Sequence, residues 1–140
     1  MKVICFDLDD TLCKEIDYLR SAYREIAEYA AEHCRGYSDP VSVLAHKAYD
    51  VMLAAYQEGQ NAFDVLNSFL GLDLPIADYL YIYRNHKPKI ALCEDVVRTL
   101  DALKAEGFRI GLITDGRSVQ QRNKIEALGL GRWIENADIV

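Results

Sequence analysis

The sequence predicts an α/β protein with a three-layer, parallel-sheet core and an inserted all-helical bundle. Two apolar segments, residues 3–6 and 108–113, have the length and composition of buried parallel strands. Between them the chain changes character, because all nine tyrosines fall between Tyr18 and Tyr83 and apolar residues recur at helical spacing. Two parallel strands need a crossover connection, which the helical segments supply.

This change of character sets the expected domain boundaries. Residues 1–13 and 88–140 form the expected α/β core, and residues 14–87 form the insertion. The last three residues, 138–140, are predicted to begin a third strand, so we expect the sheet to be incomplete at its C-terminal end. The 140 residues suffice for a hydrophobic core without disulfides.

The insertion is expected to be a bundle of about four short helices. Each segment carries start or stop signals, such as an N-cap residue, a proline in the first turn or a glycine after the last turn. The four segments are residues 16–34, ended by Gly36; residues 40–55, with Asp39 as N-cap; residues 61–70, with Asn61 as N-cap and Gly71 at the end; and residues 75–83, begun by Pro75.

Two further helices are expected in the core. Glu94 and Asp95 lie in the first turn of one helix, where acidic side chains suit the positive end of the helix dipole, and Gly107 ends it. Ser118 and Gln121 have the spacing of a capping box at the start of the other helix.

Composition narrows the classes of function. A formal net charge of −6 and a pI of about 5.0 argue against a nucleic-acid surface and favour small-molecule partners. We find no membrane span and no leader before the first strand, and the four cysteines form no CxxC pair, so a reduced, cytoplasmic protein is expected. Cys5 is expected to be a buried strand residue. Cys13 is the only thiol near the chemistry, and no base is evident to activate it.

Polar residues gather at the ends of both predicted strands. Residues 6–12 read Phe-Asp-Leu-Asp-Asp-Thr-Leu, which places Asp7 and Asp9 at the carboxyl end of the first strand. The second strand runs into Thr114-Asp115-Gly116. Ligands bind outside the carboxyl ends of the strands in open parallel sheets, so these residues predict a site for chemistry.

The two motifs, in this order, resemble the first and second signatures of the haloacid dehalogenase superfamily. The family's second motif is a hydroxyl residue followed by Asn-Gly, and Asp115 stands here in place of the Asn. The resemblance covers about residues 1–12 and 96–140 and implies a Rossmann-like core. It also implies a helical cap, inserted after the first motif, that closes over the site and selects the substrate. The tyrosines are candidates to line that cap, although packing within the bundle is favoured for most of them.

The chemistry follows from the residues themselves. Asp7, Asp9, Asp10 and Asp115 would crowd negative charge at one end of the sheet, which favours a cation, and carboxylate oxygens suit Mg²⁺. A carboxylate can attack a phosphoryl group to form an aspartyl-phosphate, and the resemblance gives this role to Asp7. Asp9 points to the same side of an extended segment, where it can serve as general acid and then as base. Asp10 is expected to be a solvated turn residue.

Other residues are expected to complete a phosphate site. The hydroxyl of Thr114 is expected to hold the phosphoryl oxygens. The backbone amides of Leu8, Asp115 and Gly116 are expected to hold them too. The expected metal ligands are Asp7, the carbonyl of Asp9 and water. Lys87 and Arg117 are candidate substrate contacts, with solvated surface residues as the alternative.

Two further motifs of the resembling family do not occur in these residues. One is a Lys that screens the charge of the phosphoryl group, and the other is an acidic pair that completes the metal site. Lys124 is the only Lys after Thr114, and its place beside Ile125 in a helix predicts a surface residue. Without the later strands, the first strand would expose an apolar edge, which favours self-association.

The favoured function is therefore a magnesium-dependent phosphatase acting on a small phosphorylated metabolite. The presence of Asp9 favours a phosphatase over a dehalogenase, and a phosphomutase is a weaker alternative. We expect the activity to be impaired or absent in this length of chain, which is expected to be truncated. The alternative from another class is a non-catalytic remnant, meaning an interaction module or half of a split protein. A phospho-accepting receiver domain also has aspartates at strand ends, but the long helical insertion argues against it.

Overall fold

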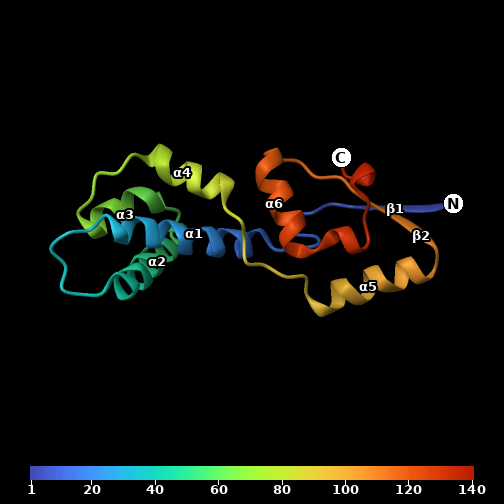
Figure 1. The fold of residues 1–140 in the computed structure, drawn as a ribbon, viewed down its shortest axis with the longest axis horizontal. Coiled ribbons are helices and arrows are strands. Elements are labelled where there is room, and N and C mark those ends of the chain that lie inside the picture. Colours follow the sequence, from blue (N-terminus) through green and yellow to red (C-terminus); the bar gives the residue numbers. More distant parts are fainter. The chain divides into compact units, whose positions relative to one another are not determined.

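The computed structural model describes residues 1–140, which divide into two compact units. The first unit comprises Met1–Tyr18 and Lys87–Val140, and the second comprises Leu19–His86. The elements, labelled in Figure 1, follow in the order β1 (Lys2–Phe6), α1 (Glu15–Glu32), α2 (Val41–Gln57), α3 (Ala62–Leu70), α4 (Ile76–Asn85), α5 (Glu94–Ala105), β2 (Phe108–Leu112), α6 (Ser118–Leu128), η1 (Leu130–Arg132) and η2 (Asn136–Asp138). None of the helices is both long and apolar enough to cross a lipid bilayer.

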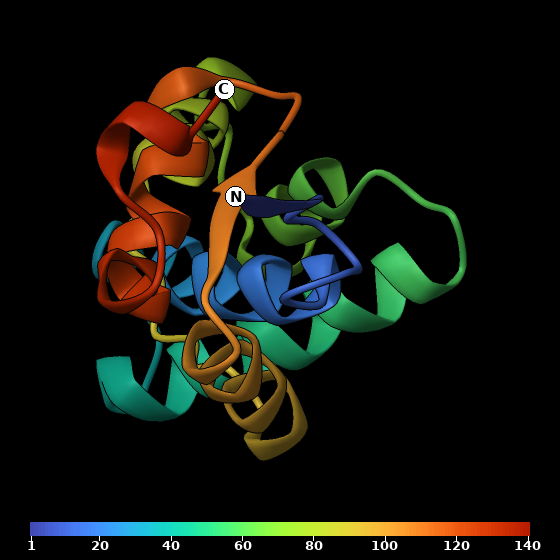
Figure 2. The same cartoon turned by 90° about the vertical axis from the view of Figure 1, so that its right-hand side faces the viewer.

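The predicted parallel sheet is confirmed. β1 and β2 run side by side (Figures 1 and 2), with Ile4 opposite Ile110 and Phe6 opposite Leu112. β1 has no second neighbour, so it is an edge strand. On the far side of β2, the predicted third strand is reduced to one parallel bridge between Leu112 and Ile139, because the residues just before it form the 3-10 helix η2.

One face of this sheet carries the hydrophobic core of the first unit. Leu100 from α5 and Leu128 from α6 belong to the same cluster as the β2 residues, together with Leu8, Leu12, Ile110, Leu112, Leu130, Trp133 and Ile134. On the opposite face Val3 is 59% exposed and Cys5 is exposed too. The prediction that Cys5 is buried is therefore wrong, because β1 is an edge strand and nothing in these residues covers this face. Two of the three expected layers, the sheet and the helices on one of its faces, lie within the chain.

Helices α1 to α4 form the predicted helical bundle, which makes up the second unit apart from the first turn of α1. Tyr79 lies at its centre with no exposed surface, and its hydroxyl donates to Oδ1 of Asn67 at 2.6 Å. Burial raises the pKa of Tyr79 to about 12. Tyr23 packs its ring against those of Tyr56 and Tyr83. These contacts show that several of the tyrosines pack within the bundle.

One of the predicted helix caps is confirmed and another is wrong. Asn61 caps α3 as predicted, since its side chain accepts the N–H groups of residues 63 and 64, and Gly71 ends that helix in the left-handed conformation. The prediction for Asp39 is wrong, because α2 begins at Val41 with Pro40 before it and no side chain caps it. The carboxylate of Asp39 instead accepts a hydrogen bond from Nζ of Lys47 at 2.9 Å.

Candidate active site

A tight turn after β1 presents the two aspartates of the first motif. The carbonyl of Leu8 accepts the N–H groups of Leu12 and Cys13 at 3.0 and 3.2 Å, and the carbonyl of Cys13 accepts the N–H of Asp10 at 2.6 Å. Asp10 has φ of 57°, a left-handed conformation that Asp adopts more readily than most residues. Leu8 has no exposed surface, so it anchors the turn in the core.

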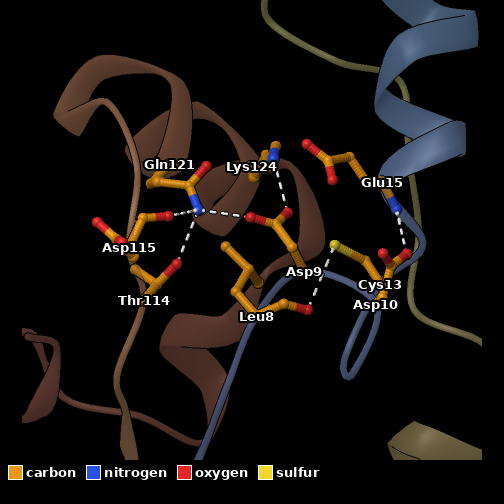
Figure 3. Close-up of polar contacts among 9 residues, drawn as sticks. All are labelled: Leu8, Asp9, Asp10, Cys13, Glu15, Thr114, Asp115, Gln121 and Lys124. Carbon is orange, nitrogen blue, oxygen red and sulfur yellow. Dashed lines mark hydrogen bonds and ion pairs between the residues drawn. The ribbon is translucent and has the colours of Figure 1, made fainter.

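Asp10 has a contact that its sequence position did not suggest. Its Oδ1 accepts the backbone N–H of Glu15 at 3.0 Å, at the first residue of α1 (Figure 3). A carboxylate at this place satisfies one of the free N–H groups of a helix start and suits the positive end of the helix dipole. Asp10 is exposed, as expected for a turn residue, and it also joins the turn to α1.

The carboxylate of Asp9 is held between two side chains of α6 (Figure 3). Oδ1 accepts a hydrogen bond from Nζ of Lys124 at 2.6 Å, and Oδ2 accepts one from Nε2 of Gln121 at 2.9 Å. The same Nε2 lies 2.7 Å from Oγ1 of Thr114 and 3.2 Å from the carbonyl oxygen of Asp115. Gln121 therefore joins the first motif to the second.

The predicted surface position of Lys124 is wrong. Its side chain is 1% exposed, and its ammonium group lies 4.8 Å from the centroid of the Tyr18 ring as well as against Asp9. The predicted capping box is also wrong, because Ser118 is the first residue of α6, no side chain caps that helix, and Gln121 turns to the strand ends. The sequence held a signal for both residues: Gln121 and Lys124 share a helix face with the buried Leu128.

Gly116 leaves room for this arrangement. Its φ of 139° is a backbone conformation that L side chains rarely adopt. A Cβ added there would lie 3.1 Å from Cδ of Gln121. The second motif thus needs glycine both for its backbone and for the close passage of the Gln121 side chain.

The remaining predicted site residues lie open to solvent. Asp7 is exposed, and no hydrogen bond or ion pair involves its side chain. Asp115 and Gly116 are exposed, and Thr114 is half-buried. Lys87 and Arg117 are exposed, with no hydrogen bond or ion pair to the other predicted site residues.

The four aspartates do not form a ready-made metal cage. No group of three or more His, Cys, Asp and Glu side chains in the chain is arranged to hold a metal ion. The carboxylate of Asp9 is already taken by Lys124 and Gln121, whereas that of Asp7 is free. The hydrogen bonds of the turn go to the carbonyls of Leu8 and Cys13, not to that of Asp9. Mg²⁺ commonly binds one or two carboxylates and several waters, and Asp7 with the Asp9 carbonyl fits that mode.

Cys13 lies beside this site as an inert thiol. Its Sγ is 3.9 Å from the carbonyl oxygen of Leu8. Burial, with a smaller contribution from the charge of Asp9, raises the pKa of Cys13 to about 11. The reactive form of cysteine is the thiolate, so Cys13 is not a nucleophile at neutral pH.

Comparison with known proteins places the chain in a family. The sequence profile of the haloacid dehalogenase-like hydrolases matches residues 1–140. This match agrees with the family resemblance that the two motifs at the strand ends indicated. The chain belongs to the haloacid dehalogenase-like hydrolase family.

Two relatives agree with this assignment, and one solved structure shows the same fold. The chain is 29% identical over 97% of its length to a glyceraldehyde 3-phosphate phosphatase of Methanocaldococcus jannaschii, and 33% identical over 99% to one of Pyrococcus furiosus. It spans 60% and 59% of those two proteins. A proposed β-phosphoglucomutase of Thermotoga maritima has the same fold, with a TM-score of 0.58 and 16% identity, over 99% of this chain and 60% of that one.

Proposed function

We propose that the chain carries the catalytic aspartates of a magnesium-dependent phosphatase that works through an aspartyl-phosphate. One observation carries the proposal. Asp7 is exposed and unpaired at the end of β1, and two residues later the Asp9 carboxylate is held by Lys124 and Gln121 beside Thr114. A free nucleophile next to a fixed acid or base is the arrangement that two-step phosphoryl transfer needs.

The proposed reaction has two steps. A carboxylate oxygen of Asp7 attacks phosphorus, the bond from phosphorus to the substrate oxygen breaks, and Asp9 gives its proton to the departing oxygen. Water then attacks the phosphorus of the aspartyl-phosphate while Asp9 takes a proton from it. The second step releases inorganic phosphate, and Asp7 returns as a free carboxylate. The net reaction consumes one water for each phosphate ester.

The second motif is suited to bind the phosphoryl oxygens. Oγ1 of Thr114 accepts its hydrogen bond from Gln121, which leaves the hydroxyl proton of Thr114 available as a donor. The backbone amides of Leu8, Asp115 and Gly116 are the other proposed donors, and backbone N–H groups need no reorganisation as charge develops. We propose that Asp7 and the Asp9 carbonyl hold Mg²⁺, which would neutralise charge on the phosphoryl group.

We propose a small phosphorylated metabolite as the substrate. An open cavity of about 630 Å³ lies beside the second motif, with Thr114, Gly116 and Gln121 in its wall, but neither Asp7 nor Asp9 lines it. The relatives named glyceraldehyde 3-phosphate phosphatases make that compound the first substrate to test. The chain spans about 60% of the length of those relatives. The activity of the whole protein is therefore something we propose.

Phosphate release tests the proposal. We expect the whole protein to release phosphate from glyceraldehyde 3-phosphate and from p-nitrophenyl phosphate with Mg²⁺, and the 140-residue chain to do so weakly or not at all. Asp7→Asn should abolish release, whereas the matched control Asp73→Asn, an exposed aspartate of the helical unit, should leave it unchanged. Equal rates for wild type and Asp7→Asn would remove Asp7 from the chemistry.

Metal binding can be tested without turnover. Calorimetric titration of the 140-residue chain at neutral pH should show weak Mg²⁺ binding that Asp7→Asn abolishes. Binding that survives in Asp7→Asn would locate the metal elsewhere.

A non-catalytic interaction module is the second candidate. The exposed apolar edge and face of β1 favour it, because such surfaces recruit other strands. Phosphate release that depends on Asp7 excludes this candidate for the whole protein.

A further inference from the structure

We infer that Lys124 is a positioning residue that anchors one oxygen of Asp9, so that the other oxygen is the one that moves the proton. The inference rests on the proposed phosphatase function. Its starting point is that both oxygens of Asp9 have donors, with Oδ1 2.6 Å from Nζ of Lys124 and Oδ2 2.9 Å from Nε2 of Gln121 (Figure 3).

The two donors are not equivalent, because only one of them has other acceptors. Nε2 of Gln121 carries two hydrogens and lies within hydrogen-bond distance of three acceptors, Oδ2 of Asp9, Oγ1 of Thr114 and the carbonyl oxygen of Asp115. Gln121 can therefore release Oδ2 and keep both hydrogens bonded. Oδ2 is the oxygen that can accept or give a proton without leaving a buried donor unpaired.

Lys124 has no such freedom. Its side chain is 1% exposed, and Asp9 is its one carboxylate partner, with the face of the Tyr18 ring as the second neighbour of the ammonium group. Separating a buried ammonium from its carboxylate is strongly unfavourable. Oδ1 therefore stays fixed on Lys124 through both steps of the reaction, and the carboxyl group of Asp9 keeps one orientation.

The packing of α6 alone does not require a lysine at this position. Lys124 lies on the buried face of α6 with Leu128, where an apolar side chain of similar length would fill the same space. Replacing both members of a buried ion pair with apolar residues is often neutral or stabilising, whereas removing one member is destabilising. A lysine aimed at the proposed acid and base thus has a role beyond packing.

Kinetics in the whole protein test this role, with Lys124→Met as the main variant. We expect kcat to fall about 10- to 100-fold on an alkyl phosphate such as glycerol phosphate, less than the loss for removing the acid itself, while KM stays within about threefold. On p-nitrophenyl phosphate, whose leaving group needs little protonation, the loss should be smaller. Lys104→Met, which removes an exposed lysine of α5, is the matched control and should change neither value.

A double variant separates action through Asp9 from direct binding of the phosphoryl group. If Lys124 acts through Asp9, adding Lys124→Met to Asp9→Asn should cost little more, because effects within one unit are not additive. A full additional loss, or a rise in KM equal to the fall in kcat/KM, would make Lys124 a phosphate ligand and overturn the inference. Gln121→Leu should cost less than Lys124→Met, and the reverse order would also overturn it.

Two controls keep the result interpretable. Lys124→Gln, which keeps a donor without the charge, should be intermediate and serves if Lys124→Met does not fold. In the 140-residue chain, the losses in the free energy of unfolding caused by Asp9→Asn and Lys124→Met should not add up in the double variant. This measurement does not require the chain to be active. An inactive wild-type protein would refute the proposed function and this inference together, whereas an active one with equal losses on both substrates would refute the inference alone.

Discussion

Each unit of the molecule has a titratable side chain that bridges two other side chains, but the two networks differ in their surroundings. In the helical unit His86, 8% exposed, lies between Oγ of Ser21 at 2.7 Å and Oε2 of Glu25 at 2.5 Å. In the α/β unit Asp9 lies between Lys124 and Gln121. The acid, imidazole and hydroxyl of the first network are those of a hydrolytic triad, yet only the second lies at strand ends beside a free carboxylate.

The comparison shows that surroundings, rather than residue types, identify a site. His86 directly follows α4, and both Ser21 and Glu25 lie in α1, so this network joins the end of α4 to α1. Asp9 also bridges two side chains, but its turn exposes Asp7, and the second motif approaches it through Gln121. We therefore expect changes in the α/β network to affect turnover and changes in the helical network to affect stability.

Asp9→Asn should give the largest effect. Removing a positioned acid or base typically costs about 10²–10⁴-fold, so turnover of the whole protein should fall by that factor. The amide keeps the size of the carboxyl group, so the fold should survive. Steady-state kinetics with glyceraldehyde 3-phosphate measure the loss, and Asp73→Asn is the control. Turnover within twofold of wild type would mean that Asp9 does not transfer the proton.

Gly116→Ala should lower both turnover and stability. The backbone at φ of 139° strains any other residue, and the added Cβ would press on Gln121 at 3.1 Å. Residues held in such conformations cost about 1–3 kcal/mol in the free energy of unfolding. Gly131→Ala, where no atom lies within 4 Å of an added Cβ, is the matched control for urea unfolding. Equal midpoints for the two variants would contradict the close passage of Gln121.

His86→Ala should lower stability and leave kcat unchanged. It removes the hydrogen bonds of His86 to Ser21 and Glu25, and a hydrogen bond contributes about 0.5–1.5 kcal/mol to the free energy of unfolding. His46→Ala is the control, because His46 is exposed and its ion pair with Asp50, at 3.7 Å, is on the surface. A large fall in kcat for folded His86→Ala would place the helical network in the chemistry and break the distinction between the two units.

How far the sequence predicted these networks depends on the range of the interactions. Asn61 is predictable as a helix cap because the N–H groups that donate to its side chain lie two and three residues away. The parallel pairing of β1 and β2 followed from composition and from the need for a crossover. Local patterns of this kind can be read from a sequence because they join neighbours along the chain.

The site residues that sequence reasoning misplaced depend on contacts between distant segments. Lys124 and Gln121 read as surface and cap residues because their partner, Asp9, lies over a hundred positions away in the sequence, and only the fold brings it near. The exposure of Cys5 depends on which strands flank β1, a fact that the composition of β1 does not contain. A polar residue on the apolar face of a helix is the signal to use in such cases.

The edge of β1 supplies a further prediction, about association. Val3 is 59% exposed on a strand with one neighbour, so we propose that the 140-residue chain pairs with a second copy through this edge. Light scattering over a concentration series should show a rise in mean mass. Val3→Lys, which places a charge on the strand, should reduce it, while Val119→Lys, also on an exposed valine, should not. A monomer at every concentration would show that the edge is protected.

The smallest effect is expected at Cys13, whose pKa of about 11 lies above the ordinary value of 9.0. At pH 8 iodoacetamide should modify the exposed Cys5 and Cys93 before Cys13, because burial keeps Cys13 as the thiol.

The raised pKa of Cys13 also determines how the stability of the fold changes with pH. Below pH 9 the folded and unfolded states both keep the proton, whereas between pH 9 and 11 only the unfolded state loses it, so the stability contributed by Cys13 falls. Cys13→Ala should remove this part of the alkaline loss, measured as the difference in unfolding midpoint between pH 8 and pH 10. A variant whose alkaline loss equals that of wild type, or rapid labelling of Cys13 at pH 8, would show that the thiol is not buried beside Asp9.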